Sequence, residues 1–275
     1  MKILVAPDKF KGSLTALDAA GAIVSGIKEF FPKAEIVSMP LADGGGGTVD
    51  AIISAVNGEK VACEVLDPLG RKIKTYFGII SQSNSTGKKR KAIIEMAKAS
   101  GFLLLKADER NPMKTTSYGT GELIKEALLM GCKEIIVGIG DTATVDGGMG
   151  ALQALGVNFL DKKGDELGLG GKELIRMKEI KVDSLIEEAK KAKFVIASDV
   201  ENILFGEKGA AYVFGPQKGA SPEEVEILDR GLRNLAKVIL EETGKDISGI
   251  KGTGAAGGIG AGFKAFLDTE IRSGI

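Results

Sequence analysis

The sequence predicts an α/β fold, and three observations lead to that prediction. Short apolar runs alternate with stretches of helical periodicity in the first sixty residues, as in a parallel α/β layer. Two extended runs around a Pro and Gly turn follow, which predicts an antiparallel hairpin and a mixed sheet. The 275 residues are 44% hydrophobic, which is enough to bury a large core.

The first sixty residues read as two strands and two helices. "KILVA" at 2–6 and "AEIVSMP" at 34–40 have the apolar character of short buried strands. Between them, residues 13–31 predict a helix with Ser13 as its N-cap. The apolar stripe of that helix is formed by Leu14, Leu17, Ile23, Ile27 and Phe30. "GTVDAIISAV" at 47–56 predicts a second helix.

Near residue 60 the pattern changes, and we place a domain boundary there. The segment 59–80 contains two extended runs around Asp67-Pro-Leu-Gly70, which is a turn signature. Residues 1–60 are therefore expected to form one lobe and residues 61–275 a second lobe that returns towards the first. The basic and polar stretch at 81–91, "SQSNSTGKKRK", is expected to be a surface loop.

The remainder of the chain again alternates between helices and strands. Helices are predicted at 118–131, 150–156 and 221–242, and strands at 134–139, 157–160, 193–200 and 210–215. The clearest helix is 221–242, where Ser221 is the N-cap and Pro222 and Glu224 follow. Its buried stripe is formed by Val225, Leu228, Leu232, Leu235 and Ile239.

Composition excludes several classes of function. Lysines plus arginines equal aspartates plus glutamates at 37 each, which argues against binding nucleic acid through bulk charge. With no histidine in the chain, Ser-His-Asp catalysis and histidine-bound metals are excluded, whereas Mg²⁺ needs only oxygen ligands. Cys63 and Cys132 have no metal-site spacing and suit a reducing compartment. No apolar stretch reaches the roughly 18 residues of a membrane span, so a cytoplasmic protein is expected.

Glycine clusters follow several of the apolar runs. In "VGIGDTATVDGG" (137–148), Gly138, Gly140 and Ala143 match a dinucleotide fingerprint, which would indicate an NAD(P)-dependent oxidoreductase. Two further glycines stand where the helix of that motif should begin. The alternative is that the chemistry depends on Asp141 and Asp146, held on a glycine turn. No P-loop motif occurs.

Four glycine turns carry a carboxylate or a lysine at a predicted strand end, at 6–13, 41–48, 138–148 and 197–206. In α/β sheets, ligands bind where such turns meet. Lys9 and Lys11 can neutralise a phosphate or carboxylate, and helix N-termini after Gly12 and Gly47 offer N–H groups to oxyanions. Asp43, Asp146 and Asp199 can hold Mg²⁺ or accept a proton from an attacking hydroxyl.

At these residues the whole chain resembles the type I glycerate kinase family. The resemblance rests on "APDKFKGSL", "ADGGGGT", "IEMAKASG", "RNPMKTTSYGTGELI", "GIGDTATVDGGMGALQALG", "SDVENILFGEKGAAYVFGPQKGA" and "GTGAAGGIGAG". It implies phosphorylation of D-glycerate to 2-phosphoglycerate with ATP and Mg²⁺. It also implies a Rossmann-like α/β lobe with a second, mixed-sheet α/β lobe inserted in it.

The resemblance leads to an expected set of site residues. We expect Asp146 to be the base or metal-ordering residue, with Asp43 and Lys9 also catalytic and Asp199 a further metal ligand. An Asn at position 146 would then abolish turnover and leave folding intact. The residues expected to bind glycerate or phosphate are Asp8, Lys11, Ser13, Gly44, Gly45, Gly47, Thr48, Gly140, Thr142, Thr144, Gly147, Gly148 and Lys218.

The chain departs from the family pattern in three places. Gly46 stands where the family has Glu within "DGGEGT", "GSATNDGG" appears as "DTATVDGG" with Asp141 for Gly, and "DVDNPL" appears as "DVENIL". Family members also continue past the equivalent of "TEIRSGI" with a segment that completes the first lobe. A second copy of the chain or a partner is therefore expected to cover that lobe, and a ligand-binding protein without turnover is an alternative to an active kinase.

Overall fold

The computed structural model describes residues 1–10, 13–84 and 87–272. Its largest element is a six-stranded sheet in the order β10-β9-β6-β5-β4-β3. The four strands β5, β6, β9 and β10 are parallel, whereas β3 and β4 are antiparallel to their neighbours. The strand bounds are Glu59–Leu66 (β3), Lys72–Asn84 (β4), Gly87–Glu95 (β5), Glu134–Gly138 (β6), Lys193–Ala197 (β9) and Asp268–Arg272 (β10). The mixed sheet and the hairpin between β3 and β4 are as the sequence predicts.

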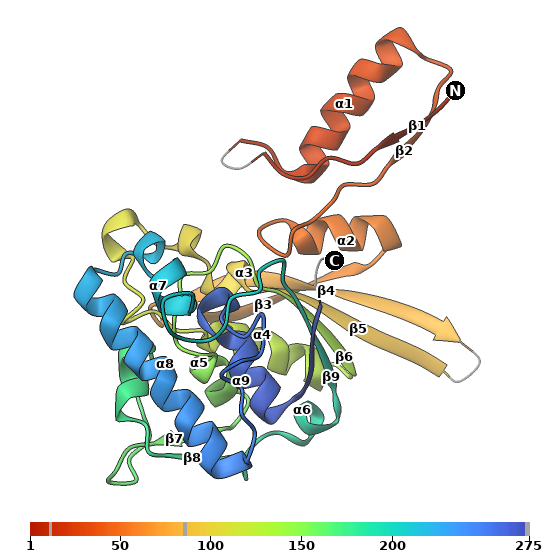
Figure 1. Ribbon diagram of the computed structural model, residues 1–275. Helices are drawn as coiled ribbons and strands as arrows, with labels where there is room; N and C mark the ends of the chain where they lie inside the picture. Colours follow the sequence, from red (N-terminus) through yellow and green to blue (C-terminus); the bar gives the residue numbers. More distant parts are fainter. Residues whose placement is uncertain (11–12, 85–86, 273–275) are drawn as a thin grey trace.

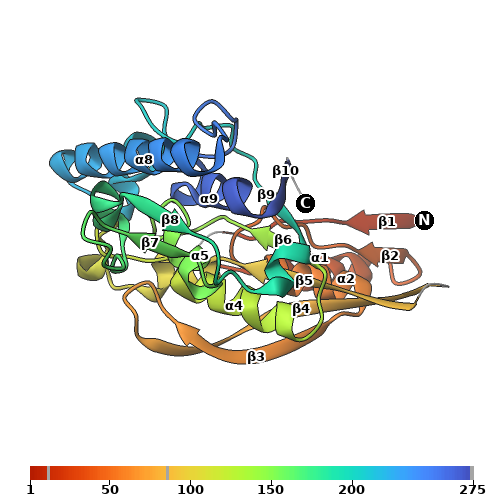
Figure 2. The same ribbon diagram turned by 90° about the horizontal axis from the view of Figure 1, so that it is seen from below.

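Helices cover both faces of this sheet. Alternate residues of a strand point to opposite faces, so Ile94 belongs to the large core and Ile93 to a smaller one. On the large-core face α4 (Tyr118–Leu129) lies across β3, β4 and β5 (Figure 2). On the other face α2 (Thr48–Val56) packs Val49 and Ile53 against Ile93.

The large core is completed by the last third of the chain. Helix α8 (Pro222–Thr243) begins at Ser221, whose side chain accepts a hydrogen bond from the Glu224 N–H, as the capping box predicts. All five residues of its predicted stripe are buried. The same core includes residues from α5 (Met149–Ala154), α6 (Glu187–Lys191), α9 (Ile259–Phe266) and the β7–β8 pair (Asn158–Leu160 and Glu179–Lys181).

The N-terminal residues form a separate small sheet. Strands β1 (Lys2–Val5) and β2 (Glu35–Ser38) pair in parallel, with α1 (Ala16–Phe30) beside them, and Figure 1 shows this unit standing away from the large sheet. The predicted cap is wrong, because Thr15 accepts the Asp18 N–H and Ser13 lies in an exposed turn. The predicted stripe is also wrong: Ala16, Ala19 and Ala20 are buried, whereas Phe30 is 79% exposed.

Two further predictions of local structure are wrong. Most of the stretch 81–91 is not a loop, because residues 81–84 belong to β4 and residues 87–91 to β5, and the two strands pair antiparallel. Residues 85–86 of this prediction lie outside the described residues. Residues 210–215 form helix α7 (Ala210–Phe214), because Ala210 and Ala211 pack into the core and a short apolar run fits either structure. The other short helices are α3 (Ala97–Ser100) and the 3-10 turns Phe102–Leu104, Ala107–Glu109, Gly171–Arg176, Pro216–Lys218 and Ala255–Gly257. Within the described ranges, no helix combines the length and apolarity required to cross a bilayer.

Candidate active site

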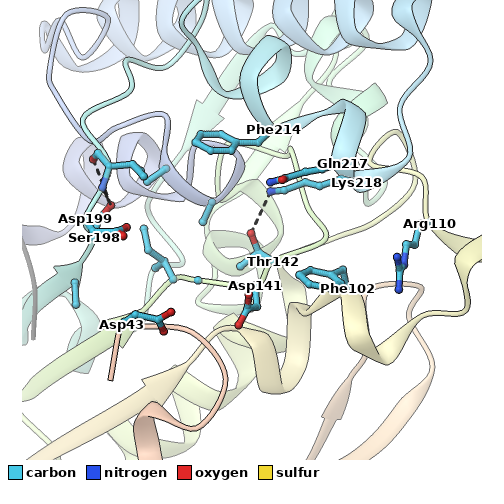
Figure 3. Close-up of a pocket in the computed structure, with 16 residues that line it drawn as sticks. Asp43, Phe102, Arg110, Asp141, Thr142, Ser198, Asp199, Phe214, Gln217 and Lys218 are labelled. Atoms are coloured by element: carbon cyan, nitrogen blue, oxygen red, sulfur yellow. Dashed lines mark hydrogen bonds between the residues drawn. The ribbon is translucent and has the colours of Figure 1, made fainter. Parts of the chain in front are cut away.

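A cavity of about 360 Å³ lies at the carboxyl ends of β6 and β9, which is where α/β sheets bind ligands. We call it the first cavity, and Figure 3 shows its lining. Asp141 and Thr142 reach it from the turn after β6, and Ser198 and Asp199 from the turn after β9. The other lining residues labelled in Figure 3 are Asp43, Phe102, Arg110, Phe214, Gln217 and Lys218.

One lysine bridges two carboxylates at the edge of this cavity. Lys9 Nζ lies 2.9 Å from Asp43 Oδ1 and 3.0 Å from Asp141 Oδ2. The three side chains come from the loop after β1, the loop before α2 and the turn after β6, so the contact joins the small sheet to the large one. We call Lys9, Asp43 and Asp141 the lysine–carboxylate bridge.

Two glycine turns hold the bridge in place. The Gly45 N–H donates to Asp43 Oδ1 at 2.8 Å, and the Gly46 N–H donates to Asp141 Oδ2 at 3.0 Å. The turns also touch each other, because the Gly140 N–H donates to the Gly44 carbonyl at 2.9 Å. A Cβ on Gly140 would lie 2.7 Å from Gly45 Cα, so the residue must be glycine for the turns to meet.

The bridge is charged at neutral pH. Burial alone would raise the pKa of Asp43 and Asp141, but the Lys9 ammonium and the Gly45 and Gly46 N–H groups hold both below their usual value. Burial would also lower the pKa of Lys9, and its bonds to the two carboxylates outweigh this and raise it. Among the described residues, Asp43 Oδ2 and Asp141 Oδ1 accept no hydrogen bond, so each carboxylate keeps one oxygen for a ligand.

The opposite wall of the first cavity is cationic. Lys218 is only 4% exposed, and its Nζ donates to Thr142 Oγ1 at 3.1 Å and to the Thr144 carbonyl at 2.8 Å. Burial lowers its pKa to about 7, although the charge of Asp146 opposes the shift. Arg110 stacks on Phe102 at 5.3 Å, and its buried Nε has no partner in the described structure. The Arg110 guanidinium and Lys218, whose pKa lies near neutrality, both present N–H donors, so this wall suits an anion.

Asp146 lies elsewhere, although the sequence makes it the leading catalytic residue. Its side chain is fully buried and accepts hydrogen bonds from the Ser117 N–H and hydroxyl, each at 2.8 Å, and from the Gly148 N–H at 3.2 Å. Burial raises its pKa against these bonds. It therefore joins the starts of α4 and α5 and does not line the first cavity, so the geometry argues against a base or metal ligand at this position.

The other predicted binding residues divide between the cavity and its supports. Gly140, Thr142 and Lys218 line the first cavity, and so does Asp199, which is exposed. Gly44, Gly45 and Thr48 shape the turn before α2, where the Thr48 hydroxyl donates to the Gly45 carbonyl at 2.7 Å, and Gly47 donates to Glu95 at 3.1 Å. Thr144, Gly147 and Gly148 are buried and do not line the cavity. Asp8 and Ser13 are exposed and line neither this cavity nor the bridge, and Lys11 lies outside the described residues.

Two of the departures from the family pattern are neighbours in space. A Cβ on Gly46 would lie 3.7 Å from Asp141 Oδ2. Asp141 thus brings a carboxylate close to position 46 from the other turn. Asp141 adopts a left-handed φ of 57°, which Asp tolerates better than most residues.

The residues present suit Mg²⁺ in part. The described residues contain no group of three or more side chains placed to hold a metal ion. Mg²⁺ is commonly held by one or two carboxylates together with substrate phosphates, and Asp43 and Asp141 each offer a free oxygen for that.

Sequence reasoning gave no role to Arg110 or Glu95. Arg110 opens the motif "RNPMKTTSYGTGELI", but nothing local shows that it faces a cavity. Glu95 is 2% exposed and accepts the N–H groups of Gly47 at 3.1 Å and Val49 at 3.2 Å, which fixes the start of α2 on the large sheet. The only sequence feature that could have indicated this role of Glu95 is its position directly after the apolar run of β5.

Comparison with known proteins shows the family of the chain. The model of the glycerate kinase family matches residues 3–275. The chain belongs to the glycerate kinase family. It is 47% identical over its whole length to a glycerate kinase of Haemophilus influenzae, and 46% identical to a glycerate 2-kinase of Escherichia coli, covering 71% of each. A crystal structure assigned to glycerate kinase 2 of Salmonella typhimurium superposes with a TM-score of 0.89 at 44% identity, over all of this chain and 72% of that one.

This glycerate kinase family member is thus an α/β phosphotransferase, and glycerate is the substrate that gives the family its name. The dinucleotide interpretation of Gly138, Gly140 and Ala143 does not fit the structure. Cβ atoms on Gly138 and Gly140 would meet the backbone of Gly44 and Gly45, so these glycines make room for the other turn and not for a pyrophosphate. Ala143 is buried, and α5 begins only at Met149.

Proposed function

We propose that this chain transfers the γ-phosphoryl group of ATP to the 2-hydroxyl of D-glycerate with Mg²⁺. The observation that carries the proposal is the lysine–carboxylate bridge facing a cationic wall across one cavity. A small hydroxy acid has the matching polarity, with a carboxylate at one end and a hydroxyl beside it. The name glycerate 2-kinase of the relative from Escherichia coli supports the choice of hydroxyl.

Lys218 and Arg110 would bind the glycerate carboxylate. Both present N–H donors to the cavity, and a bound carboxylate would give the Arg110 Nε the acceptor that it lacks. This anchoring directs the hydroxyl end of glycerate towards Asp141. Because the substrate's charge would sit beside a buried ammonium, binding favours the protonated form of Lys218.

The bridge would then carry the transfer. The free oxygen of Asp141 accepts a hydrogen bond from the glycerate hydroxyl and orients it, and it takes the proton as the oxygen–phosphorus bond forms and the bond to ADP breaks. Lys9 neutralises charge on the transferred group. Mg²⁺, when bound to Asp43 and the phosphates, supplies further neutralisation. Asp199 is a third carboxylate that lines the same cavity.

We also keep as a proposal the division into lobes 1–60 and 61–275. The separate sheet of β1 and β2 supports it, although α2 packs on the larger sheet. On this division the bridge spans the two lobes, because Lys9 and Asp43 belong to one and Asp141 to the other.

The test measures ADP release by the purified chain with D-glycerate, ATP and Mg²⁺, against a reaction without glycerate. We expect glycerate-dependent release, with phosphorus NMR showing 2-phosphoglycerate. Asp43→Asn and Asp141→Asn should each lower kcat by at least about a hundredfold. Asp165→Asn, an exposed aspartate outside both turns, should leave it unchanged. Absence of glycerate-dependent release, or near-normal turnover by Asp141→Asn, would refute the proposal.

A further inference from the structure

A second cavity of about 510 Å³ borders the bridge on its other side. Ile73, Lys74, Lys98, Leu103, Leu104 and Asp141 are among its lining residues. In the sheet order β9-β6-β5-β4, the first cavity lies beyond β6 and β9, and the second lies beyond β5 and beside β4. Asp141 follows β6 and lines both, so it stands between them.

The two cavities differ in chemistry. The first has Arg110, Lys218 and three aspartates on its wall. The second exposes mainly apolar side chains from β4 and from the turn after α3, including Leu103, which is 76% exposed. Covering such an exposed apolar side chain with a flat apolar ligand removes apolar surface from water, which makes binding of that ligand favourable.

The charged residues of the second cavity are two lysines, Lys74 and Lys98, and two carboxylates, Glu95 and Asp141. Lys74 lines it, and Lys98 is held with its Nζ 2.9 Å from the Tyr76 hydroxyl and 4.1 Å above the centre of that ring. Lys98 lies 3.8 Å from both Glu95 and Asp50, so it is positioned by three groups and not free in solvent. Its position suits a polyphosphate that runs from the apolar wall towards Asp141.

In-line phosphoryl transfer needs the donor and the acceptor on opposite sides of the transferred group. Two cavities on either side of Asp141 meet that requirement. The polar first cavity suits a small hydroxy acid, whereas the larger and more apolar second cavity suits a purine base and its ribose.

We propose that the second cavity is the nucleoside site of the phosphoryl donor. This inference rests on the proposed function, since it takes the first cavity as the glycerate site. The base covers Leu103 and Leu104, the phosphates pass Lys98 towards the Gly46 turn, and the terminal phosphoryl group reaches the bridge.

The chain contains no tryptophan, so a single introduced tryptophan reports on one place. Leu103→Trp marks the second cavity, Phe214→Trp the first, and Leu129→Trp, exposed at the end of α4 and outside both, is the matched control. ADP and adenosine should each quench Leu103→Trp saturably, and D-glycerate should change only Phe214→Trp. Quenching of Phe214→Trp by ADP with no change in Leu103→Trp, or no response of Leu103→Trp at saturating ADP, would overturn the inference.

Ala97→Phe places a ring in the second cavity and gives a test that needs no reporter. We expect its KM for ATP to rise at least about tenfold while its KM for D-glycerate stays within about twofold. Equal effects on both KM values would contradict the inference. The wild-type release assay separates the two failures: turnover with a silent Leu103→Trp refutes only the nucleoside site, whereas absent turnover refutes the proposed function.

Discussion

Replacing Lys218 by Met should make the protein more stable and less able to bind glycerate. Lys218 is 4% exposed, and within the described structure the hydrogen bonds of its ammonium go to Thr142 and Thr144, not to a carboxylate. Its pKa falls from 10.5 to about 7. At about 1.4 kcal/mol per pKa unit, keeping the charge buried costs on the order of 5 kcal/mol. The variant also loses the hydrogen bonds to Thr142 and to the Thr144 carbonyl, which offsets about 1–3 kcal/mol of the stability it gains.

The pH dependence identifies the cause. Between pH 7 and 10.5 the unfolded chain binds the Lys218 proton and the folded chain does not, so wild-type stability rises with pH through this window. The variant lacks that contribution. Its advantage should therefore be largest below pH 7, at a few kcal/mol, and should shrink by about 1.4 kcal/mol per pH unit above it.

Urea unfolding of both proteins at pH 6, 8 and 9.5 measures this difference, with the KM for D-glycerate measured in parallel. Lys237→Met, on the exposed face of α8, is the matched control and should change stability little at any pH. A Lys218→Met protein that is less stable than wild type at pH 6, or whose advantage does not vary with pH, would show that the buried-charge reasoning is wrong.

Two further predictions concern the carboxylates of the glycine turns. Asp146→Ala should lower the free energy of unfolding by about 3 kcal/mol or more, because it leaves the donors of Ser117 and Gly148 buried without an acceptor. If Asp146→Ala has normal stability but no turnover, Asp146 has a catalytic role and the structural interpretation is wrong. Asp141→Gly should abolish glycerate-dependent ADP release, and Gly46→Glu added to it should restore a measurable part, since a Cβ at 46 lies 3.7 Å from Asp141 Oδ2. Failure of the double variant to exceed Asp141→Gly, with both folded by circular dichroism, would count against an exchangeable carboxylate.

Patterns within a few residues of one another were sufficient to predict part of this structure from the sequence. The capping box and stripe of α8, the turn between β3 and β4, and the apolar runs of β6 and β9 all act locally, so the sequence determines them. The ordered glycine motifs likewise identify the family. The prediction of a strand at 210–215 is wrong because a short apolar run fits a strand or a buried helix. The helix predicted at 13–31 is present as α1, but its predicted buried stripe is wrong because those side chains are largely uncovered.

Only the tertiary structure decided which polar residues line the two cavities. Asp141 and Asp146 stand on the same glycine turn and look equivalent in sequence, yet one lines two cavities and the other is fully buried against Ser117. Lys9 meets Asp141 across 132 residues, and burial in the wall of the first cavity lowers the pKa of Lys218. Such contacts depend on how sheets and turns pack, and no short-range pattern encodes them. The sequence by itself determined the fold class, several of the helices and strands, and the family, and packing determined which aspartate and which lysine line the first cavity.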